Sequence, residues 1–292
     1  MISDYRCFFC FVKAFEKLLD KEKLDNESKN CFTRDMATLY QREWNTFSAP
    51  IFSRKLHEIL KHYTGNPDPY KEAKQENNDL VLKMYPDLKN RVHLSGNPFD
   101  TALRLAIAGN IIDFAANSNF DLDSTMDKVL NSAFAIDHSR QLKRAINKAN
   151  TVLYLGDNAG EIVFDKLFIE NIGHPNIFYA VRGAPVINDA TVIDAEYVGM
   201  GDVAKVISNG YDAPSTILEH CSPEFRDVFY QADVIISKGQ GNLEGVLEHT
   251  DKDIFYLLMV KCDVIAELLQ VKKGDFVVRQ TILKNEDSYC QR

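Results

Sequence analysis

Hydrophobic residues recur at two different spacings along the chain, and the change comes near residue 150. Before it, apolar residues return every three or four positions in "FVKAFEKLLDKEKL", "APIFSRKLHEILKHYTG" and "DLVLKMYPDLKNRV", a spacing that predicts amphipathic helices. Pro50 and Pro69 predict helix starts, because proline is tolerated in the first helical turn. We expect a long apolar helix in "NPFDTALRLAIAGNIIDFAAN" and two more in "STMDKVLNSAFAIDHSRQLKRAINKA", the second beginning near Asp137.

From Thr151 onwards, short β-branched runs alternate with helical patterns. The runs are "TVLYLG", "NIFYAVRG", "AKVISNG", "VIISKG" and "IFYLLMVK", and "DFVVRQTIL" is expected to add a strand at an edge. Strands that are apolar throughout and alternate with helices predict a parallel sheet covered on both faces. The sequence therefore predicts an α/β fold with a doubly wound, mostly parallel sheet of five or six strands over residues 151–292, preceded by an all-helical subdomain over residues 1–150.

Polar residues with small neighbours follow each of the first five predicted strands. Ligands of open α/β sheets bind beyond the carboxyl ends of the strands, so these loops predict a binding site. The first loop holds Asp157 and Asn158, the second leads to Asp189, the fourth strand ends in Lys238, and Lys261 follows the fifth. The other residues expected to contact a substrate or its phosphate are Gly160, Glu161, Arg182, Asn188, Ser208, Asn209, Asp212, Ser237 and Gly239.

Two carboxylates and an amide at this edge predict a metal site. Carboxylate and amide oxygens are hard ligands that suit Mg²⁺, Mn²⁺ or a related divalent ion. Asp157, Asn158 and Asp189 are expected to supply three oxygens, which leaves room for water and a substrate phosphate. A purely structural role is the alternative, because Asp often caps the helix that follows it. That alternative suits Asp189 better than the adjacent pair at 157 and 158, since one cap does not need two polar groups.

Lys238 lies between small residues in "SKGQGN" and predicts a contact to phosphate. Glycine permits close backbone approach, a helix N-terminus attracts anions, and lysine adds a point charge. No Walker A sequence, G-x-x-x-x-G-K-[ST], occurs. A metal beside an anion site predicts hydrolysis of a phosphate ester. Attack by water is favoured over attack by Asp157, because the D-x-D arrangement of aspartyl-phosphate enzymes is absent.

Composition and charge narrow the range of partners. The net charge of −8, from 42 acidic and 34 basic residues, argues against nonspecific binding to nucleic acid or to an anionic membrane. No stretch approaches the roughly 18 apolar residues that a membrane span needs. The N-terminus lacks the features of a signal peptide, so we expect a cytoplasmic protein. Cys7 and Cys10 form a C-x-x-C without a second pair, and we expect them to be buried thiols on a helix face.

Several of these motifs occur in order in a known family. "LGDNAGEIVFDK", "VRGAPVINDAT", "ISNGYDAPSTIL", "ISKGQGNLEG" and "LLMVKCDVIAELLQVKKGD" resemble the metal-dependent damage-control phosphatases, in particular their compact stand-alone prokaryotic branch. The resemblance implies a divalent metal (Mn, Co, Ni or Mg) at Asp157, Asn158 and Asp189, and a phosphate contact at Lys238. It further implies hydrolysis of small phosphorylated metabolites, either sugar phosphates or damaged phosphorylated cofactors. Asn110 and Asp113 of "GNIIDF" match a motif of the helical half that is expected to face the cleft.

Two other functions remain alternatives to hydrolysis. "LYLGDNAG" resembles the glycine-rich first loop of S-adenosylmethionine-dependent methyltransferases. An acidic residue normally ends the second strand of those enzymes and binds the ribose, whereas this chain has Arg182 there, and Gly156 and Gly160 do not have the G-x-G spacing. A noncatalytic protein that binds a metabolite or a metal is the third possibility.

Overall fold

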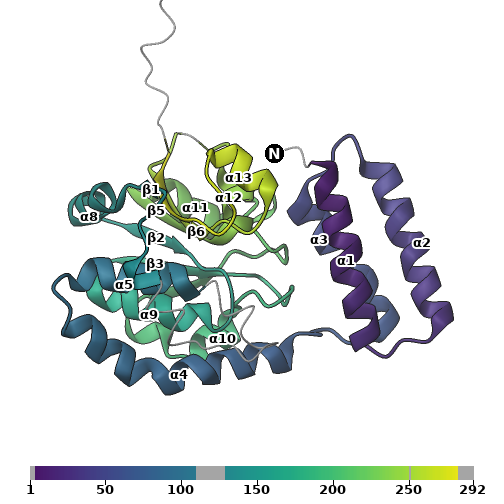
Figure 1. The fold of residues 1–292 in the computed structure, drawn as a ribbon, viewed down its shortest axis with the longest axis horizontal. Helices are drawn as coiled ribbons and strands as arrows, with labels where there is room; N and C mark the ends of the chain where they lie inside the picture. The colour runs from purple at the N-terminus through teal and green to yellow at the C-terminus, as the bar shows by residue number, and fades with distance from the viewer. Residues whose placement is uncertain (1–3, 110–128, 250, 282–292) are drawn as a thin grey trace, which may run out of the picture.

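The computed structural model describes residues 4–109, 129–249 and 251–281. Its first three helices form a bundle beside the rest of the protein (Figure 1). They are α1 (Tyr5–Lys21), α2 (Asn26–Glu43) and α3 (Ala49–Thr64), and Pro50 lies in the first turn of α3 as predicted. The bundle has a hydrophobic core of its own, in which rings such as Phe32 and Phe52 are fully buried.

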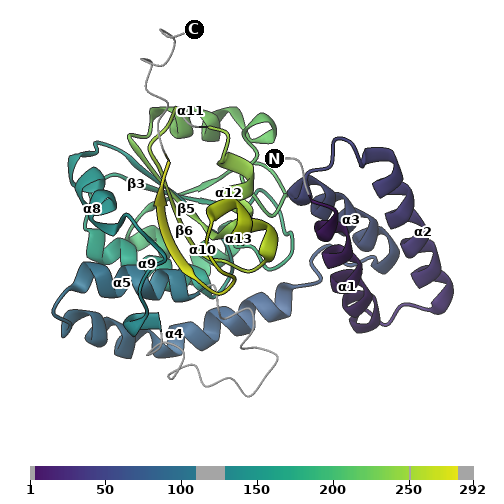
Figure 2. The same ribbon diagram turned by 45° about the horizontal axis from the view of Figure 1, so that its top comes forward.

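The remaining helices cover both faces of a central sheet (Figures 1 and 2). One face packs against α4 (Lys71–His93), α5 (Pro98–Ala108), α8 (Ser139–Lys148), α9 (Glu161–Ile172) and α10 (Val192–Tyr197). The other packs against α11 (Pro223–Gln231), α12 (Gly239–Val246) and α13 (Asp263–Leu269). Two 3₁₀ turns lie at Met200–Asp202 and Leu218–His220. Burial on both faces explains why the strands are apolar throughout.

The sheet has seven strands within the described residues, in the order β1-β7-β6-β5-β2-β3-β4. The five strands β2 to β6 are parallel to one another, so their carboxyl ends meet at one edge, and β7 is antiparallel to β6. In the register of the parallel strands, Leu155 of β2 pairs with Ala180 of β3 and with Ser237 of β5. The strands are β1 (Ile136–Asp137), β2 (Val152–Leu155), β3 (Ile177–Val181), β4 (Lys205–Ser208), β5 (Val234–Lys238), β6 (Ile254–Met259) and β7 (Phe276–Gln280).

The α/β class and the mostly parallel sheet are confirmed, and three details differ from the prediction. The two-residue strand β1 was expected to be helical, and it brings the number of strands to seven. β7 lies between β6 and β1 and not at an edge, because β1 covers it. The hydrophobic core of the first face includes Leu105 and Leu142 together with Tyr154. The predicted boundary at residue 150 therefore runs through a shared core.

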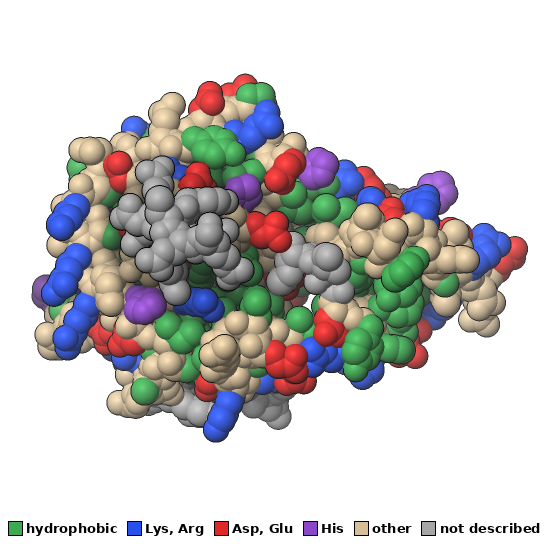
Figure 3. Space-filling model, turned by 90° about the horizontal axis from the view of Figure 1, so that it is seen from above, with side chains coloured by type: hydrophobic (Ala, Val, Ile, Leu, Met, Phe, Trp, Pro, Cys, Tyr) green, Lys and Arg blue, Asp and Glu red, His purple; other side chains and the backbone are tan. Residues whose placement is uncertain are grey.

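The surface of the described residues is mixed in charge. Figure 3 shows acidic and basic side chains interspersed over the face it presents. No helix in the described ranges is both long and apolar enough to span a bilayer. Cys10 is exposed and Cys7 is partly buried, so the expectation of two buried thiols is wrong for Cys10.

Candidate active site

The loop after β2 lies at the point where the order of the sheet reverses. β3 and β4 lie on one side of β2, and β5 and β6 lie on the other. A crevice for ligands forms at such a switch point. Asp157 and Asn158 lie in this loop, and Gly239 begins α12 directly after the neighbouring strand β5, with φ +75°. A side chain at Gly239 would overlap the Oδ2 atom of Asp157. Glycine at this position therefore lets the loop after β2 approach the start of α12.

Backbone hydrogen bonds bring the three predicted metal ligands together. Asn158 and Asp189 form an isolated antiparallel bridge. The N–H of Ala190 donates to the carbonyl oxygen of Asp157 at 2.8 Å, and the N–H of Ala159 donates to that of Asn188 at 2.9 Å. These bonds tie the loop after β2 to the loop after β3. The side chains of Asp157 and Asn158, and of Asp189 some thirty residues later in the chain, are all buried at one edge of the sheet.

A buried arginine contacts both carboxylates. Arg182 follows β3, and its Nε donates to Asp189 Oδ2 at 2.5 Å. Its Nη2 lies 3.5 Å from Asp157 Oδ1, and its Nη1 donates to Asn242 Oδ1 at 2.9 Å. Nη2 makes no hydrogen bond to any described residue, although it is buried. Since buried polar atoms are almost always hydrogen-bonded, this N–H pair is suited to an anionic ligand.

The amide of Asn158 is oriented by two acidic neighbours. Its Nδ2 donates to Asp157 Oδ2 at 3.0 Å and to Glu161 Oε2 at 3.1 Å. Both contacts use the nitrogen, so the Oδ1 atom points away from the two carboxylates. The amide oxygen is thereby left available to a cation, because a carboxamide nitrogen cannot act as a metal ligand in this state.

Lys238 lies below this layer and not at its surface. Its Nζ is fully buried and donates to Glu161 Oε1 at 2.6 Å, to Asp165 Oδ1 at 2.5 Å and to the carbonyl oxygen of Ala106 at 2.9 Å. Asp165 also accepts hydrogen bonds from the hydroxyls of Tyr154 and Tyr179. A lysine ammonium has three N–H donors. A phosphate contact by Lys238 would thus require one of these three bonds to be given up.

The chemistry of Asp157, Asn158 and Asp189 fits a divalent cation. Burial, followed by the charges of Asp189 and Glu161, raises the pKa of Asp157 well above its ordinary value. A dication at the two carboxylates would remove this penalty by neutralising charge where it accumulates. The described residues hold no group of three or more His, Cys, Asp or Glu side chains placed to bind a metal, so a metal at this site would need a ligand of another type, such as the amide oxygen of Asn158.

The other residues predicted for the site divide into four groups. Gly160 and Asn188 lie in the loops after β2 and β3, Glu161 begins α9, and the Gly160 N–H donates to Asn78 Oδ1 at 2.6 Å. Asn209 is buried after β4, with its Nδ2 unpartnered among the described residues. Three further predicted positions serve other contacts or face elsewhere, and two lie outside the described residues. Ser208 accepts a hydrogen bond from the Gly210 N–H, and Asp212 forms an ion pair with Arg54 of α3. Ser237 precedes Lys238 and therefore faces the opposite side of β5. Asn110 and Asp113 lie outside the described residues.

Asn78 of α4 was not predicted as part of the site. It caps the loop by accepting from Gly160 and donates through Nδ2 to Asp194 Oδ1 at 3.2 Å. The residue is 1% exposed, so a polar side chain has been placed on the buried face of a helix. The feature of the sequence that could have indicated this role is the pair of adjacent polar residues, Asn77 and Asn78, on the inner face of α4.

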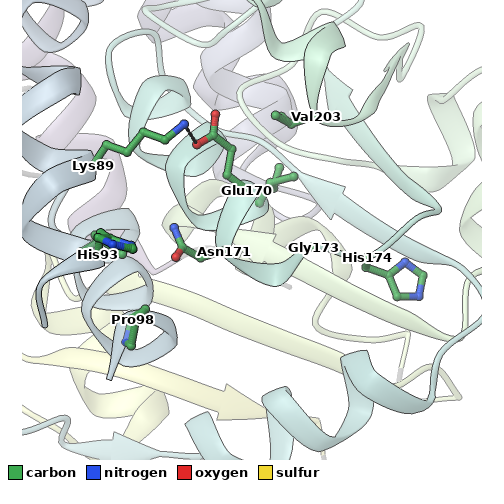
Figure 4. A pocket seen from close by; sticks show the side chains of 10 residues that line it. Lys89, His93, Pro98, Glu170, Asn171, Gly173, His174 and Val203 are labelled. Carbon is green, nitrogen blue, oxygen red and sulfur yellow. Dashed lines mark ion pairs between the residues drawn. The ribbon is translucent and has the colours of Figure 1, made fainter. Parts of the chain in front are cut away.

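A cavity of about 620 Å³ lies at the opposite end of the sheet, between the C-terminal ends of α4 and α9 (Figure 4). Lys89 and Glu170 form an ion pair of 2.8 Å across it. Both ring nitrogens of His174 are hydrogen-bonded to backbone, one to the carbonyl oxygen of Ala149 and one to the N–H of Asn176. None of the predicted site residues lines this cavity, so the switch point remains the candidate active site.

Comparisons with known proteins identify the family of the chain. Residues 3–277 match the model of the damage-control phosphatase ARMT1-like domain. The chain is 34% identical over 289 residues to a damage-control phosphatase of Pyrococcus horikoshii, with 97% of this chain and all of that protein covered. It is 31% identical to a damage-control phosphatase of Archaeoglobus fulgidus, over 82% of this chain and 83% of that one. The crystal structure of a DUF89 family protein from P. horikoshii superimposes with a TM-score of 0.89 at 32% identity, over 97% of this chain and 100% of that chain.

Proposed function

Because this chain belongs to the damage-control phosphatase ARMT1-like family, we propose that it is a phosphatase that uses a divalent metal ion to hydrolyse phosphate monoesters of small metabolites. A phosphatase role follows from the family. The dependence on Mn²⁺, Co²⁺, Ni²⁺ or Mg²⁺, the monoester chemistry and the nature of the substrates, sugar phosphates or damaged phosphorylated cofactors, belong to the proposal.

One observation carries the proposal. Two carboxylates and an oriented amide, Asp157, Asp189 and Asn158, lie at the switch point of the sheet beside an arginine whose Nη2 makes no hydrogen bond to a described residue. A cation site and an anion site thus lie next to each other. A metal-bound phosphate ester needs this combination.

Each residue is assigned a role in the proposed reaction. When bound, the divalent ion supplies a Lewis acid for the phosphoryl oxygens and lowers the pKa of a water molecule. Arg182 Nη2 faces the phosphate, and Asp189 holds the guanidinium in place at 2.5 Å. Glu161 orients the Asn158 amide. We assign the nucleophile to water, because Asp157 is held at both oxygens, by Asn158 Nδ2 and beside Arg182.

The contacts of Arg182 support hydrolysis over methyl transfer. Methyltransferases need a carboxylate at the end of the second strand for the ribose of their cofactor. Here that position holds a guanidinium whose Nε and Nη1 are fixed by Asp189 and Asn242. A cation at this position attracts a phosphate, but it has no acceptor for a ribose hydroxyl.

Phosphate release tests the proposal. Purified protein, first stripped of metal by chelation, is assayed for inorganic phosphate with a panel of sugar phosphates and phosphorylated cofactors, with and without Mn²⁺, Co²⁺, Ni²⁺ or Mg²⁺. We expect metal-dependent turnover, and Asp157→Ala should abolish it together with metal binding measured by calorimetry. Asp202→Ala is the matched control, since the Asp202 side chain is 78% exposed and pairs with Lys166. Full turnover by the Asp157 variant, or tight adenosylmethionine binding without phosphate release by the wild type, would refute the assignment.

A further inference from the structure

Helix α4 packs against the two loops that carry the predicted metal ligands. It lies below α9 and α10 in Figure 1 and contacts both helices. The loops are residues 156–160, between β2 and α9, and residues 182–191, between β3 and α10, and we call them the ligand loops. A Cβ atom added at Gly160 would lie 2.9 Å from the Cβ atom of Asn77, so the first ligand loop rests directly on α4.

A single side chain of α4, that of Asn78, connects the two ligand loops. Its Oδ1 accepts from the Gly160 N–H at 2.6 Å, and its Nδ2 donates to Asp194 Oδ1 at 3.2 Å. The other carboxylate oxygen of Asp194 accepts from the backbone N–H of Thr191 at 2.9 Å and from the Thr191 hydroxyl at 2.7 Å. Gly160 and Thr191 each lie two residues after a predicted metal ligand. Each loop is therefore held just beyond the ligand that it carries.

The contact between Asn78 and Asp194 exceeds what a helix cap requires. Asp194 is the third residue of α10 and forms a capping box with Thr191, for which one carboxylate oxygen is enough. The second oxygen of Asp194 accepts from Asn78 of α4 instead. This arrangement fixes the orientation of the Asn78 amide, because the Gly160 N–H requires an oxygen and the Asp194 carboxylate requires a nitrogen donor.

Lys74 supplies a positive charge to this buried network. It lies one turn before Asn78 on the same face of α4. Its Nζ is 2.9 Å from Asp68 Oδ2 and 3.5 Å from Asp194 Oδ2. Lys74, Asp194 and Asn78 are all buried, and a buried carboxylate is costly unless it is paired and hydrogen-bonded. One face of α4 therefore presents an acceptor, a donor and a cation to the ligand loops, which packing of an apolar face would not need.

We propose that Asn78 and Asp194 are positioning residues for the divalent ion. They hold the ligand loops in the arrangement in which Asp157, Asn158 and Asp189 can bind the same ion. This inference rests on the proposed metal-dependent function and deepens it. The backbone hydrogen bonds between the ligand loops set the distance of one loop from the other, whereas the Asn78 network fixes both loops to a helix. Groups that orient metal ligands without touching the metal commonly contribute roughly 10–100-fold to metal affinity.

Exchange of the two side chains tests the proposal. Asn78→Asp removes the donor to Asp194 and sets two carboxylates against each other, and Asp194→Asn places an amide N–H pair against another donor. Each single change should weaken Mn²⁺ binding by the metal-stripped protein about tenfold in calorimetry. The double variant, Asn78→Asp with Asp194→Asn, keeps every hydrogen bond, because the carboxylate then accepts from the Gly160 N–H and from the amide at position 194. It should bind Mn²⁺ within about threefold of the wild type.

Asn90→Ala is the matched control, because Asn90 is an exposed asparagine of the same helix. It should leave the dissociation constant for Mn²⁺ unchanged. Urea unfolding of every variant separates a loss of stability from a loss of positioning. Single variants that are less stable than the wild type but bind Mn²⁺ equally well would overturn the inference. A double variant that binds Mn²⁺ no better than the single variants would overturn it as well.

Metal binding needs no turnover, so this inference and the proposed function fail in different ways. If the exchange restores Mn²⁺ binding but no phosphate ester is hydrolysed by the wild type, the phosphatase proposal fails and the positioning roles stand. If phosphate release requires a metal but the single variants bind it normally, the function stands and the inference is refuted. If the wild type binds none of Mn²⁺, Co²⁺, Ni²⁺ or Mg²⁺, the metal site is refuted and the inference is refuted with it.

Discussion

Replacing Lys238 by methionine should destabilise the protein severely. The ammonium group is fully buried, and it is the cation shared by Glu161 at 2.6 Å and Asp165 at 2.5 Å. Methionine has a similar length, so the change removes charge with little loss of volume. Breaking a buried ion pair by removal of one partner costs about 3–5 kcal/mol, which is a large part of the roughly 5–15 kcal/mol that stabilises a folded domain.

The pH dependence of this loss is specific. The pKa of Asp165 is already raised to about 6, mainly by burial, and Lys238 is the main group that lowers it. Without Lys238 it rises further. A native carboxyl with a raised pKa holds its proton more tightly than the unfolded chain does, so stability is greatest at low pH and is lost as pH rises through the native pKa. The deficit of the variant should therefore be larger at pH 8 than at pH 5.

Urea unfolding followed by circular dichroism at pH 5, 6.5 and 8 measures the effect, from the midpoint and the slope of each transition. Lys89→Met is the control, because the Lys89 side chain is 59% exposed and its ion pair with Glu170 should be worth less than about 1 kcal/mol. A Lys238 variant within about 1 kcal/mol of the wild type at pH 8 would refute a structural role for this lysine. That result would instead favour the contact between Lys238 and phosphate that the sequence predicts.

Two further changes test the position of the Asp157 carboxylate and the burial of Glu244. Gly239→Ala should abolish metal binding in calorimetry while the circular dichroism spectrum is retained, because the new methyl group displaces the Asp157 carboxylate; unchanged metal affinity would show that Asp157 is not held there. Burial raises the pKa of Glu244 from its ordinary 4.5 to about 7. The free energy of unfolding should fall as pH rises between these values. In urea unfolding, the stability of Glu244→Gln relative to the wild type should increase by about 1–3 kcal/mol between pH 5 and pH 8. A constant difference would contradict this.

The predicted metal ligands could be brought together from sequence because of the geometry of parallel sheets. Their strands present all carboxyl ends at one edge, so a residue after β2 and a residue after β3 are neighbours if the strands are. Asp157, Asn158 and Asp189 meet for this reason. Their assignment as metal ligands stays a prediction. The contribution of Asn78 was not predictable in the same way, because helical periodicity identifies the buried face of α4 but not the loop it packs against.

The helical half was less predictable for a related reason. Periodicity shows that a helix has an apolar face, but it does not say which surface covers that face. The helices α1 to α3 cover one another, whereas α4 and α5 pack on α9 and complete a layer of the sheet. The strand β1 is two residues long, which is too short to establish an alternating pattern.

The surroundings of Lys238 determine the net charge of the buried cluster at the site. β5 is buried on both faces, so alternation could not indicate that Lys238 faces α9 and its acidic residues. Among the described residues, Asp157, Glu161, Asp165 and Asp189 form one buried cluster with the cations of Lys238 and Arg182. If all six are ionised, four negative and two positive charges leave a net charge of −2. A buried excess of negative charge is costly unless it is neutralised, and a divalent ion bound at this cluster would neutralise it.

With that ion bound, the cluster would be neutral and would offer little attraction to a phosphate dianion. The positive charge would then have to come from outside the cluster. Lys238 cannot provide it without giving up one of its bonds, because its Nζ donates to the two acidic residues of α9, one turn apart at 161 and 165, and to the carbonyl oxygen of Ala106.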